Sequence, residues 1–303
     1  MFKSKLLFST IAFAFIMLGA AMTSNAQATR TWVSGVGDDV NPCSRTAPCK
    51  TFAGAISKTA TNGEINCLDP GGFGAVTITK SITIDCEDTQ GSILAAGTNG
   101  VIINITLATD TRKAVRLRGL SINGANTGIN GVRVLAANSV NLEEVVIDGF
   151  GTHGVSIETT SGTPKISIDN CAMRRNVGQG INSFVTGGTV SLDVSNTLLN
   201  NNATGLSLSS NTKATISNSV INSNTTGLVA ASASMGVRAC TISNNTTGIS
   251  SLAGGSIRVM NSMVTANGTG LSPSGGGLIF SHVSNVFAGN TADGAPTSSP
   301  VLQ

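Results

Sequence analysis

Aromatic and charged side chains are scarce in this chain. The 303 residues include no tyrosine, one tryptophan and ten phenylalanines, and charged residues make up 11% of the sequence with a net charge of +3. So small a net charge does not favour nucleic acid as a partner. Scarce aromatic rings weigh against carbohydrate-processing activity, because sugars commonly stack on such rings. Phe150 and Phe184 lie near the charged middle of the chain, but core packing is the simpler role for both.

Acidic residues almost disappear toward the C-terminus. From residue 194 onward the single acid is Asp293. Hydrolysis of a glycosidic bond needs two carboxyl groups about 5 to 9.5 Å apart. The C-terminal part therefore cannot host such a pair, and any catalytic site has to lie in the middle of the chain.

Long apolar runs are absent apart from one near the N-terminus. Lys3 and Lys5 precede an apolar run from Leu6 to Ala21, and small residues around Ala26 offer a cleavage site. This pattern predicts a secretory signal peptide over residues 1–26. The run is short for a membrane span, which needs about 20 residues. We therefore expect an exported protein, periplasmic or extracellular, with no membrane span after signal cleavage.

A regular recurrence of glycine organises the second half of the chain. Four of these glycines end near-copies of the tetrapeptide Asn-x-Thr-Gly, of which Asn202-Ala203-Thr204-Gly205 is the first. A repeat of 21 to 26 residues predicts a solenoid. The recurring glycines are Gly128, Gly154, Gly180, Gly205, Gly227, Gly248 and Gly270.

The segments between the glycines have the pattern of short strands. In stretches such as Ala214–Ile221 and Ser256–Val264, apolar residues alternate with small polar ones, as in strands with one buried face. One coil of short strands per repeat predicts an all-β fold, a right-handed parallel β-helix, with coils about 4.8 Å apart. The recurring glycines are expected to supply a positive φ at a corner of each coil.

The asparagines of the tetrapeptides fall in one column if the coils stack in register. Asn tolerates left-handed conformations, and its amide can bond to the Asn of the next coil. The same triplets also match the Asn-x-Thr acceptor pattern for glycosylation. The ladder is the favoured interpretation, because the triplets follow from the repeat itself. The column consists of Asn202, Asn224, Asn245 and Asn267.

The six cysteines divide into two predicted disulfides and two free thiols. Cys43 and Cys49 flank a short loop, and Cys67 and Cys86 lie 19 residues apart in similar surroundings. If 19 residues form one early coil, the second pair is stacked at about 4.8 Å, within reach of a disulfide. The remaining two, Cys171 and Cys240, fall three coils apart at one coil position, so we expect both to be buried and free.

The region after the predicted signal peptide suggests an N-terminal cap. Phe52, Ala53, Ile56 and Ala60 are spaced to form one apolar helical face, and Asn62-Gly63 offers a stop. Such a helix would cover the open edge of the first coil.

The segment from Trp32 to Cys43, followed by Ala47-Pro48-Cys49-Lys50-Thr51-Phe52, resembles the opening of many exported bacterial proteins of the pectate-lyase-like superfamily. That resemblance implies a right-handed parallel β-helix with an N-terminal capping helix. Its members include lyases, hydrolases, epimerases, tailspikes and adhesins, so the fold does not assign an activity. The expected divisions are a signal peptide at 1–26, a strand, disulfide loop and capping helix at 27–63, the β-helix at 64–294 and a tail at 295–303.

The charged residues of the middle coils are the weak candidates for a site. Aligning the repeats places Arg118, Glu143 and Asp169 in one outward column and Asp148 beside Arg174 in another. Stacked carboxylates could act as a catalytic pair, whereas arginines beside them favour a solvated surface ladder. The candidate catalytic residues are Glu143, Asp148, His153, Asp169 and Arg174.

The sequence favours an exported scaffold or interaction protein, surface- or adhesion-like, without an evident catalytic site. Its partner would be an unknown protein or a glycan surface. The alternative is a polysaccharide lyase or glycoside hydrolase acting on acidic glycans through the middle coils, and a third hypothesis is a trimeric fibre. No cofactor or metal site is expected, and Ca²⁺ enters under the lyase alternative alone. The pair Asp38-Asp39 fits an Asx turn better than a calcium loop.

Overall fold

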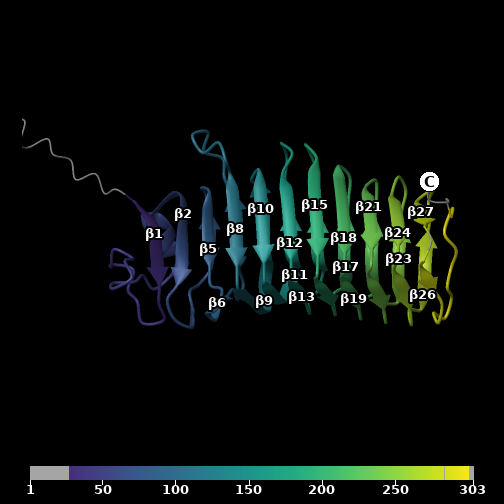
Figure 1. The fold of residues 1–303 in the computed structure, drawn as a ribbon, viewed down its shortest axis with the longest axis horizontal. Helices are drawn as coiled ribbons and strands as arrows, with labels where there is room; N and C mark the ends of the chain where they lie inside the picture. The colour runs from purple at the N-terminus through teal and green to yellow at the C-terminus, as the bar shows by residue number, and fades with distance from the viewer. Residues whose placement is uncertain (1–26, 283, 300–303) are drawn as a thin grey trace, which may run out of the picture.

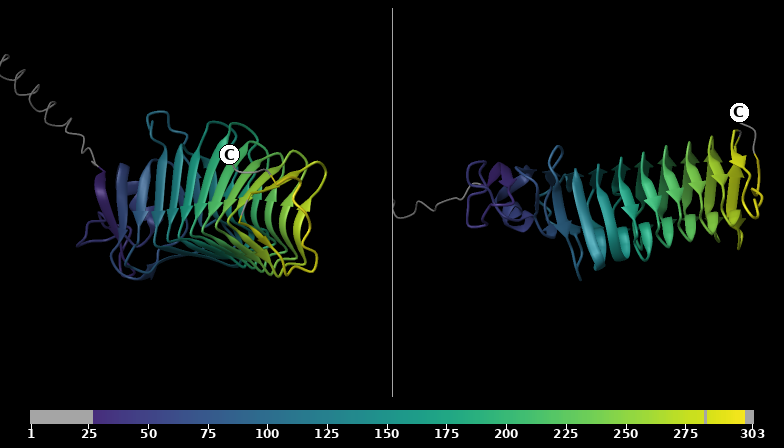
Figure 2. Two further views of the ribbon diagram at one scale, coloured as in Figure 1. Left: turned by 45° about the vertical axis from the view of Figure 1, so that its right-hand side comes forward. Right: turned by 90° about the horizontal axis from the view of Figure 1, so that it is seen from below.

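The computed structural model describes residues 27–282 and 284–299, and these residues wind into a right-handed parallel β-helix of about ten turns (Figures 1 and 2). The predicted fold class is therefore confirmed. The predicted signal peptide, residues 1–26, lies outside the described residues. No described helix is long and apolar enough to cross a membrane.

Sheet 1, which faces the viewer in Figure 1, takes one strand from each coil, and all its pairings are parallel. Its outer face carries most of the charged residues discussed below. In spatial order its strands are β1 (Ala28–Val33), β2 (Thr59–Cys67), β5 (Ile82–Asp85), β8 (Ala114–Arg118), β10 (Ser139–Glu143), β12 (Lys165–Asp169), β15 (Val190–Ser195), β18 (Thr212–Ser217), β21 (Ser234–Arg238), β24 (Ser256–Met260) and β27 (Leu278–Ser281).

Each coil also contributes to two further sheets. Two long strands, β9 (Leu120–Ala136) and β11 (Val146–Ile157), bend around the corner between these sheets and belong to both. Sheet 2 adds β3 (Gly71–Gly72), β6 (Gly91–Leu94), β13 (Ala172–Arg174), β16 (Leu198–Asn200), β19 (Val220–Asn222), β22 (Thr241–Ser243), β25 (Met263–Thr265) and β28 (Val286–Phe287). Sheet 3 adds β4 (Val76–Ile78), β7 (Val101–Asn104), β14 (Gln179–Ser183), β17 (Thr204–Leu208), β20 (Thr226–Ala230), β23 (Thr247–Ser251) and β26 (Thr269–Pro273).

Alternation of apolar and polar residues explains why these segments become strands. In β18, Ala214 and Ile216 point into the coil and are buried, whereas Lys213 and Thr215 point outward. The inward residues of successive coils form one continuous hydrophobic core that runs the length of the solenoid. Each fully buried Val, Leu or Ile stabilises the fold by about 1.5–3 kcal/mol, so the core supplies the main driving force.

The predicted asparagine ladder is present and is longer than expected. Asn202 donates its backbone and side-chain N–H groups to the Oδ1 of Asn224, at 2.9 and 3.2 Å, and the same pattern repeats along the column. Asn176 and Asn290 extend it at the two ends. The four predicted members are at most 4% exposed, so the folded chain cannot present them for glycosylation.

The recurring glycines have a different physical reason from the one predicted. None of the seven has a positive φ. A Cβ on Gly227 would instead lie 2.4 Å from the carbonyl oxygen of Gly248, and one on Gly205 would lie 2.6 Å from that of Gly227. The glycines are stacked so closely that no side chain fits between the coils.

Residues with a positive φ lie at two corners of the later coils. Each directly precedes a column of equivalent residues other than the glycine column. One set leads into the column of Cys171 and Cys240, and the other leads into the asparagine ladder. Most are Asn, Ser or Ala, with φ between 49° and 57°. The first set is Asn170, Asn196, Asn218, Ala239 and Asn261, and the second is Arg175, Asn201, Ser223, Asn244 and Ala266.

A helix and a loop cover the N-terminal end of the solenoid. Helix α2 (Phe52–Lys58) is capped by Thr51, whose hydroxyl accepts from the N–H of Gly54 at 2.9 Å. It packs against β1, β2 and β4. The loop between Cys43 and Cys49 pairs with the outer edge of β1, since the N–H of Trp32 donates to the carbonyl of Cys43 at 2.9 Å. Both devices protect edges that would otherwise invite aggregation.

The capping helix is shorter than the segment, Phe52 to Ala60, that was predicted to form its apolar face. It ends at Lys58 because Thr59 adopts an extended conformation and begins β2, which pairs with β1. Ala60 therefore belongs to a strand, and Ala53 is exposed, so the prediction for these two residues is wrong. Strand β2 crosses the expected boundary at residue 64.

Both predicted disulfides are present. The Cα atoms of Cys43 and Cys49 are 4.6 Å apart, and those of Cys67 and Cys86 are 4.9 Å apart, about one coil spacing. Cys171 and Cys240 are buried and free, as predicted. Burial raises the pKa of the Cys171 thiol to about 12, which makes it unreactive at neutral pH.

The C-terminal end is covered by the chain itself. The N–H of Thr297 donates to the carbonyl of Ile279 at 2.8 Å, and that of Ser281 donates to Ser298 at 3.0 Å. The part of the expected tail that the structure describes, up to residue 299, therefore lies against β27.

Candidate functional site

The five candidate catalytic residues do not converge on one cleft. Glu143 and Asp169 face each other in register on β10 and β12, on the outer face of sheet 1. Asp148 and Arg174 are paired on β11 and β13 of sheet 2, beyond a corner. His153 lies further along β11. The predicted columns are thus correct, but they occupy different faces of the coil.

Glu143 is held by two arginines of the preceding coil. Arg116 donates from Nε to one carboxylate oxygen at 2.9 Å and from its terminal nitrogen to the other at 2.5 Å, a bidentate pair. Arg118 lies 3.7 Å away and also contacts Asp85 and Glu87. These contacts occupy both oxygens of the carboxylate, so Glu143 is engaged within the protein rather than free to contact a substrate.

Asp169 is held by neutral donors of the next coil. The hydroxyl of Ser195 donates to its Oδ1 at 2.6 Å, and the amide of Asn196 donates to the same oxygen at 2.8 Å. These hydrogen bonds lower the pKa of Asp169, with Ser195 the largest cause. A general acid requires the opposite shift at neutral pH.

Asp148 is the most buried of the candidate acids, with its side chain 8% exposed. Arg174 donates to it at 3.1 Å, as the predicted column implied, and Arg175 adds a bidentate contact at 2.8 and 2.5 Å. Burial alone would raise the pKa of this carboxyl, but the hydrogen bonds and charges of Arg175 and Arg174 outweigh it, so the pKa is lowered. Arg175 reaches Asp148 from a left-handed corner position, which the repeat pattern does not reveal.

The Asp148 cluster predicts acid sensitivity. Because its pKa is lower in the folded than in the unfolded chain, the cluster stabilises the fold above the usual carboxyl pKa, near 3.8, and this contribution is lost as the pH falls through the folded value. The urea midpoint is expected to hold between about pH 7 and 5 and to drop below about pH 4. In Asp148→Asn the drop should be smaller, although other carboxyls with lowered pKa values leave a residual slope. Parallel curves for the two proteins would contradict this assignment.

His153 is a structural residue of the turn. Its Nδ1 accepts a hydrogen bond from the backbone N–H of Gln179 at 3.2 Å, and burial lowers its pKa. A neutral imidazole that accepts at Nδ1 carries its proton on Nε2, so neither nitrogen is free to act as a base. These contacts are those of a polar residue that stabilises the turn rather than of a catalytic base.

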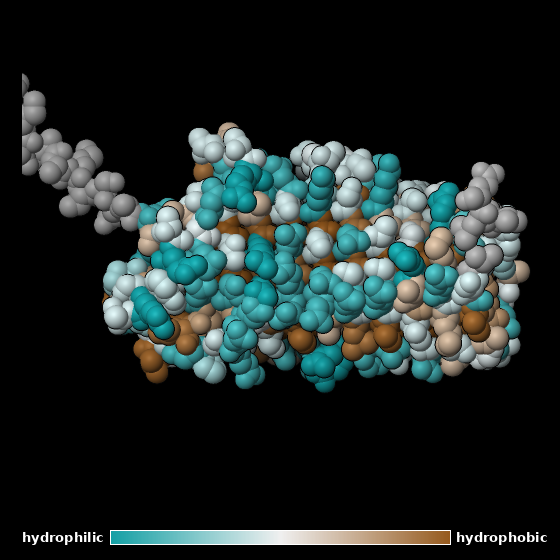
Figure 3. Space-filling model, in the orientation of Figure 1, coloured by the Kyte–Doolittle hydropathy of each residue, from teal (hydrophilic) through white to brown (hydrophobic). Residues whose placement is uncertain are grey.

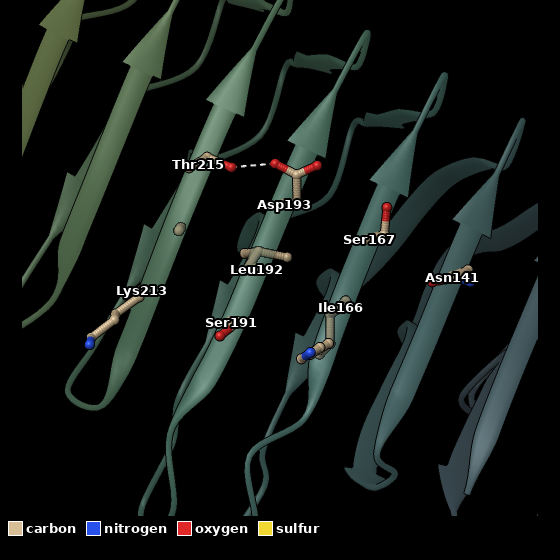
Figure 4. Close-up of a pocket in the computed structure, with 10 residues that line it drawn as sticks. Asn141, Ile166, Ser167, Ser191, Leu192, Asp193, Lys213 and Thr215 are labelled. Atoms are coloured by element: carbon tan, nitrogen blue, oxygen red, sulfur yellow. Dashed lines mark hydrogen bonds between the residues drawn. The ribbon is translucent and has the colours of Figure 1, made fainter. Parts of the chain in front are cut away.

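A hollow on the outer face of sheet 1 lies beside Glu143 and Asp169 and was not identified by sequence motifs. It has a volume of about 460 Å³ and crosses strands β10 to β18. Hydrophobic residues are visible between the hydrophilic ones on this face (Figure 3). Ser167 and Ser191, which line the hollow, have small side chains (Figure 4). Lys165 and Lys213 lie on either side of Ser191 on the neighbouring strands. Asp193 on β15 accepts a hydrogen bond from the hydroxyl of Thr215 on the adjacent strand β18.

The described residues offer poor ligands for a metal ion. No group of three or more His, Cys, Asp or Glu side chains is suitably placed among residues 27–282 and 284–299. Asp39 is engaged in local structure, since it accepts from the N–H groups of Lys50 and Thr51 at 2.8 and 2.9 Å.

Comparison with known proteins supports the fold. A family described as "Right handed beta helix region" matches residues 187–296. The crystal structure of pectate lyase Pel9A superposes with a TM-score of 0.66 at 14% identity, covering 91% of this chain and 81% of that chain. The mannuronan C-5 epimerase AlgE6 A-module from Azotobacter vinelandii aligns at 12% identity with a TM-score of 0.36, covering 79% and 89% of the two chains. No curated protein matches the sequence. The likeness to the pectate lyase shows a shared fold alone.

Proposed function

We propose that this protein is an exported, non-catalytic interaction module that uses the outer face of sheet 1 as its binding surface. The observation that carries the proposal is the state of the acids: Glu143, Asp148 and Asp169 are each held by arginines or hydrogen-bond donors. The hollow at Ser191 lies next to Glu143 and Asp169 on the same face. The outer face of sheet 1 is therefore better suited to binding a partner than to transferring a proton.

The shape of that surface suits a long partner lying along the solenoid axis. Parallel strands place Lys165 and Lys213 two coils apart, about 9.6 Å. Neither lysine joins an ion pair with any residue the structure describes. Serine hydroxyls and the amide of Asn141 along the floor can donate or accept hydrogen bonds from successive units of a chain.

Export is part of the proposal. The two disulfides persist best in an oxidising compartment, and the sequence predicts a signal peptide ahead of them. Exposure to the periplasm or the medium would bring a polymer partner within reach.

A polysaccharide-processing enzyme is the alternative, and one observation favours it. Glu143 and Asp169 face outward in register on adjacent strands, at about the separation that a retaining hydrolase requires. Against it stand the arginines that already occupy the carboxylate of Glu143, and the lowered pKa of Asp169, which makes that residue a poor proton donor. Both hypotheses can be separated by one set of variants.

Native gels that contain neutral or acidic polysaccharides test the proposal. We expect at least one polymer to retard the protein without being degraded, with and without Ca²⁺. Ser191→Trp, which fills the hollow, should weaken binding about tenfold or more, whereas Ser207→Trp on sheet 3 should leave it unchanged. Release of unsaturated or reducing ends that disappears in Asp169→Ala would establish the enzyme instead. No retardation by any polymer would exclude a glycan partner and leave a protein surface.

A further inference from the structure

The single tryptophan lies outside the core, on the surface of the first strand. In β1, Thr31 and Val33 are buried, and Trp32 points to the other side and is half-buried. Other outward positions in the same row of sheet 1 are mostly polar or charged, for example Asn66, its partner on β2. A large ring that does not fill the core is free to contact a ligand.

Two hollows meet at this ring. One of about 450 Å³ opens toward the β2 and β5 side of Trp32, and one of about 900 Å³ opens toward the disulfide loop. Leu68, 38% exposed, lines the first, and Val40, 85% exposed, lines the second. Trp32 thus borders both hollows at the N-terminal end of the solenoid, the left-hand end in Figure 1, and we refer to Trp32, Leu68 and Val40 together as the platform.

The rim of the platform is polar, and its free charges cancel. Arg30 is paired with Glu64 at 3.0 Å, and Asp85 and Glu87 are occupied by Arg118. Two exposed groups of the first hollow, Arg45 and Asp88, make no ion pair with any described residue. They offer hydrogen-bond donors and acceptors with no net charge between them.

We propose that Trp32 is the stacking platform of a site for a neutral, hydroxyl-rich carbohydrate. A sugar ring has an apolar C–H face that packs on a flat aromatic ring, and its hydroxyls both donate and accept at the rim. A rim whose free charges cancel offers a polyanionic chain no electrostatic attraction, which favours a neutral one. This site is separate from the hollow at Ser191 and does not depend on the function proposed there.

Tryptophan fluorescence tests the site directly, because the chain has one tryptophan and no tyrosine. Purified protein is titrated with neutral hexasaccharides, such as those of cellulose, xylan, mannan and starch, and with hexagalacturonate. We expect at least one neutral sugar to change the emission in a saturable way, and hexagalacturonate to have no effect. Binding of the same sugar, measured by calorimetry, should weaken about tenfold or more in Trp32→Ala, which corresponds to about 1.4 kcal/mol.

Three further variants keep the test decisive. Trp32→Phe should retain part of the affinity, because it keeps a ring, and Phe184→Ala, which removes an aromatic ring that is 58% exposed elsewhere, should bind normally. If Trp32→Ala does not fold, the double variant Arg45→Ala with Asp88→Asn changes exposed groups alone and should still weaken binding. Unchanged emission with every neutral sugar, or binding that survives both Trp32→Ala and the double variant, would overturn the proposal.

Discussion

Gly227→Ala is expected to destabilise the β-helix by about 3 kcal/mol or more. A Cβ at this position would lie 2.4 Å from the carbonyl oxygen of Gly248, and that oxygen belongs to a backbone held in the next coil. Relief would require the two coils to separate and would strain the ladder hydrogen bonds on either side. Urea denaturation followed by far-UV circular dichroism measures the loss.

The matched control is Gly236→Ala, in β21. There a Cβ would meet its nearest neighbour, a methyl of Thr215, at 3.8 Å, which is ordinary contact. This change should be neutral or should stabilise by up to about 1 kcal/mol through the unfolded chain. Gly227→Asn adds a second distinction, because Asn tolerates a positive φ but not a close contact, and it should be as damaging as Gly227→Ala. Similar midpoints for Gly227→Ala and Gly236→Ala would rule out the close-approach explanation.

The glycines show what a repeat can and cannot reveal. The spacing of Gly205 and Gly227 correctly aligned the coils, because stacked coils require equivalent residues at equivalent positions. The reason for glycine was predicted wrongly. Periodicity shows which positions are equivalent, but not whether glycine is needed there for a positive φ or for close contact with the next coil. The left-handed conformations lie at other residues, such as Asn201 and Ser223.

The candidate site was predictable to a similar degree. Register alone placed Arg118, Glu143 and Asp169 in one row, as the structure has them. Which side chain would bind Glu143 was not predictable, because Arg116 reaches it diagonally from a different row. Long side chains choose among several neighbours within reach, and that choice depends on geometry that a linear pattern does not contain.

The hollows escaped sequence analysis for a different reason. A hollow arises where small residues are flanked by larger ones on neighbouring coils, as Ser191 is by Lys165 and Lys213. None of these residues carries a motif. Trp32 was recognised as part of the first strand, but its exposure depends on how the disulfide loop pairs with that strand's edge.

Asn224→Ala is expected to cost about 3–5 kcal/mol, because it removes one buried member of the asparagine ladder. The N–H groups of Asn202 would lose their acceptor, now at 2.9 and 3.2 Å. The carbonyl of Leu199 and the Oδ1 of Asn245, each 3.0 Å from the Asn224 amide, would lose a donor. Each buried group left without a partner costs about 1–3 kcal/mol, and the losses partly overlap.

Asn222→Ala, two residues away, supplies the matched control. The side-chain oxygen of Asn222 is buried without a hydrogen-bond partner among the described residues. Its removal should therefore leave the urea midpoint unchanged or raise it slightly, although both variants delete one amide. Hydrogen exchange on the Asn224→Ala protein should also show faster exchange at the backbone N–H of Asn202, because that group loses its acceptor. If the two variants lose equal stability, the ladder does not hold the coils together, and the stacked hydrophobic core alone must account for their cohesion.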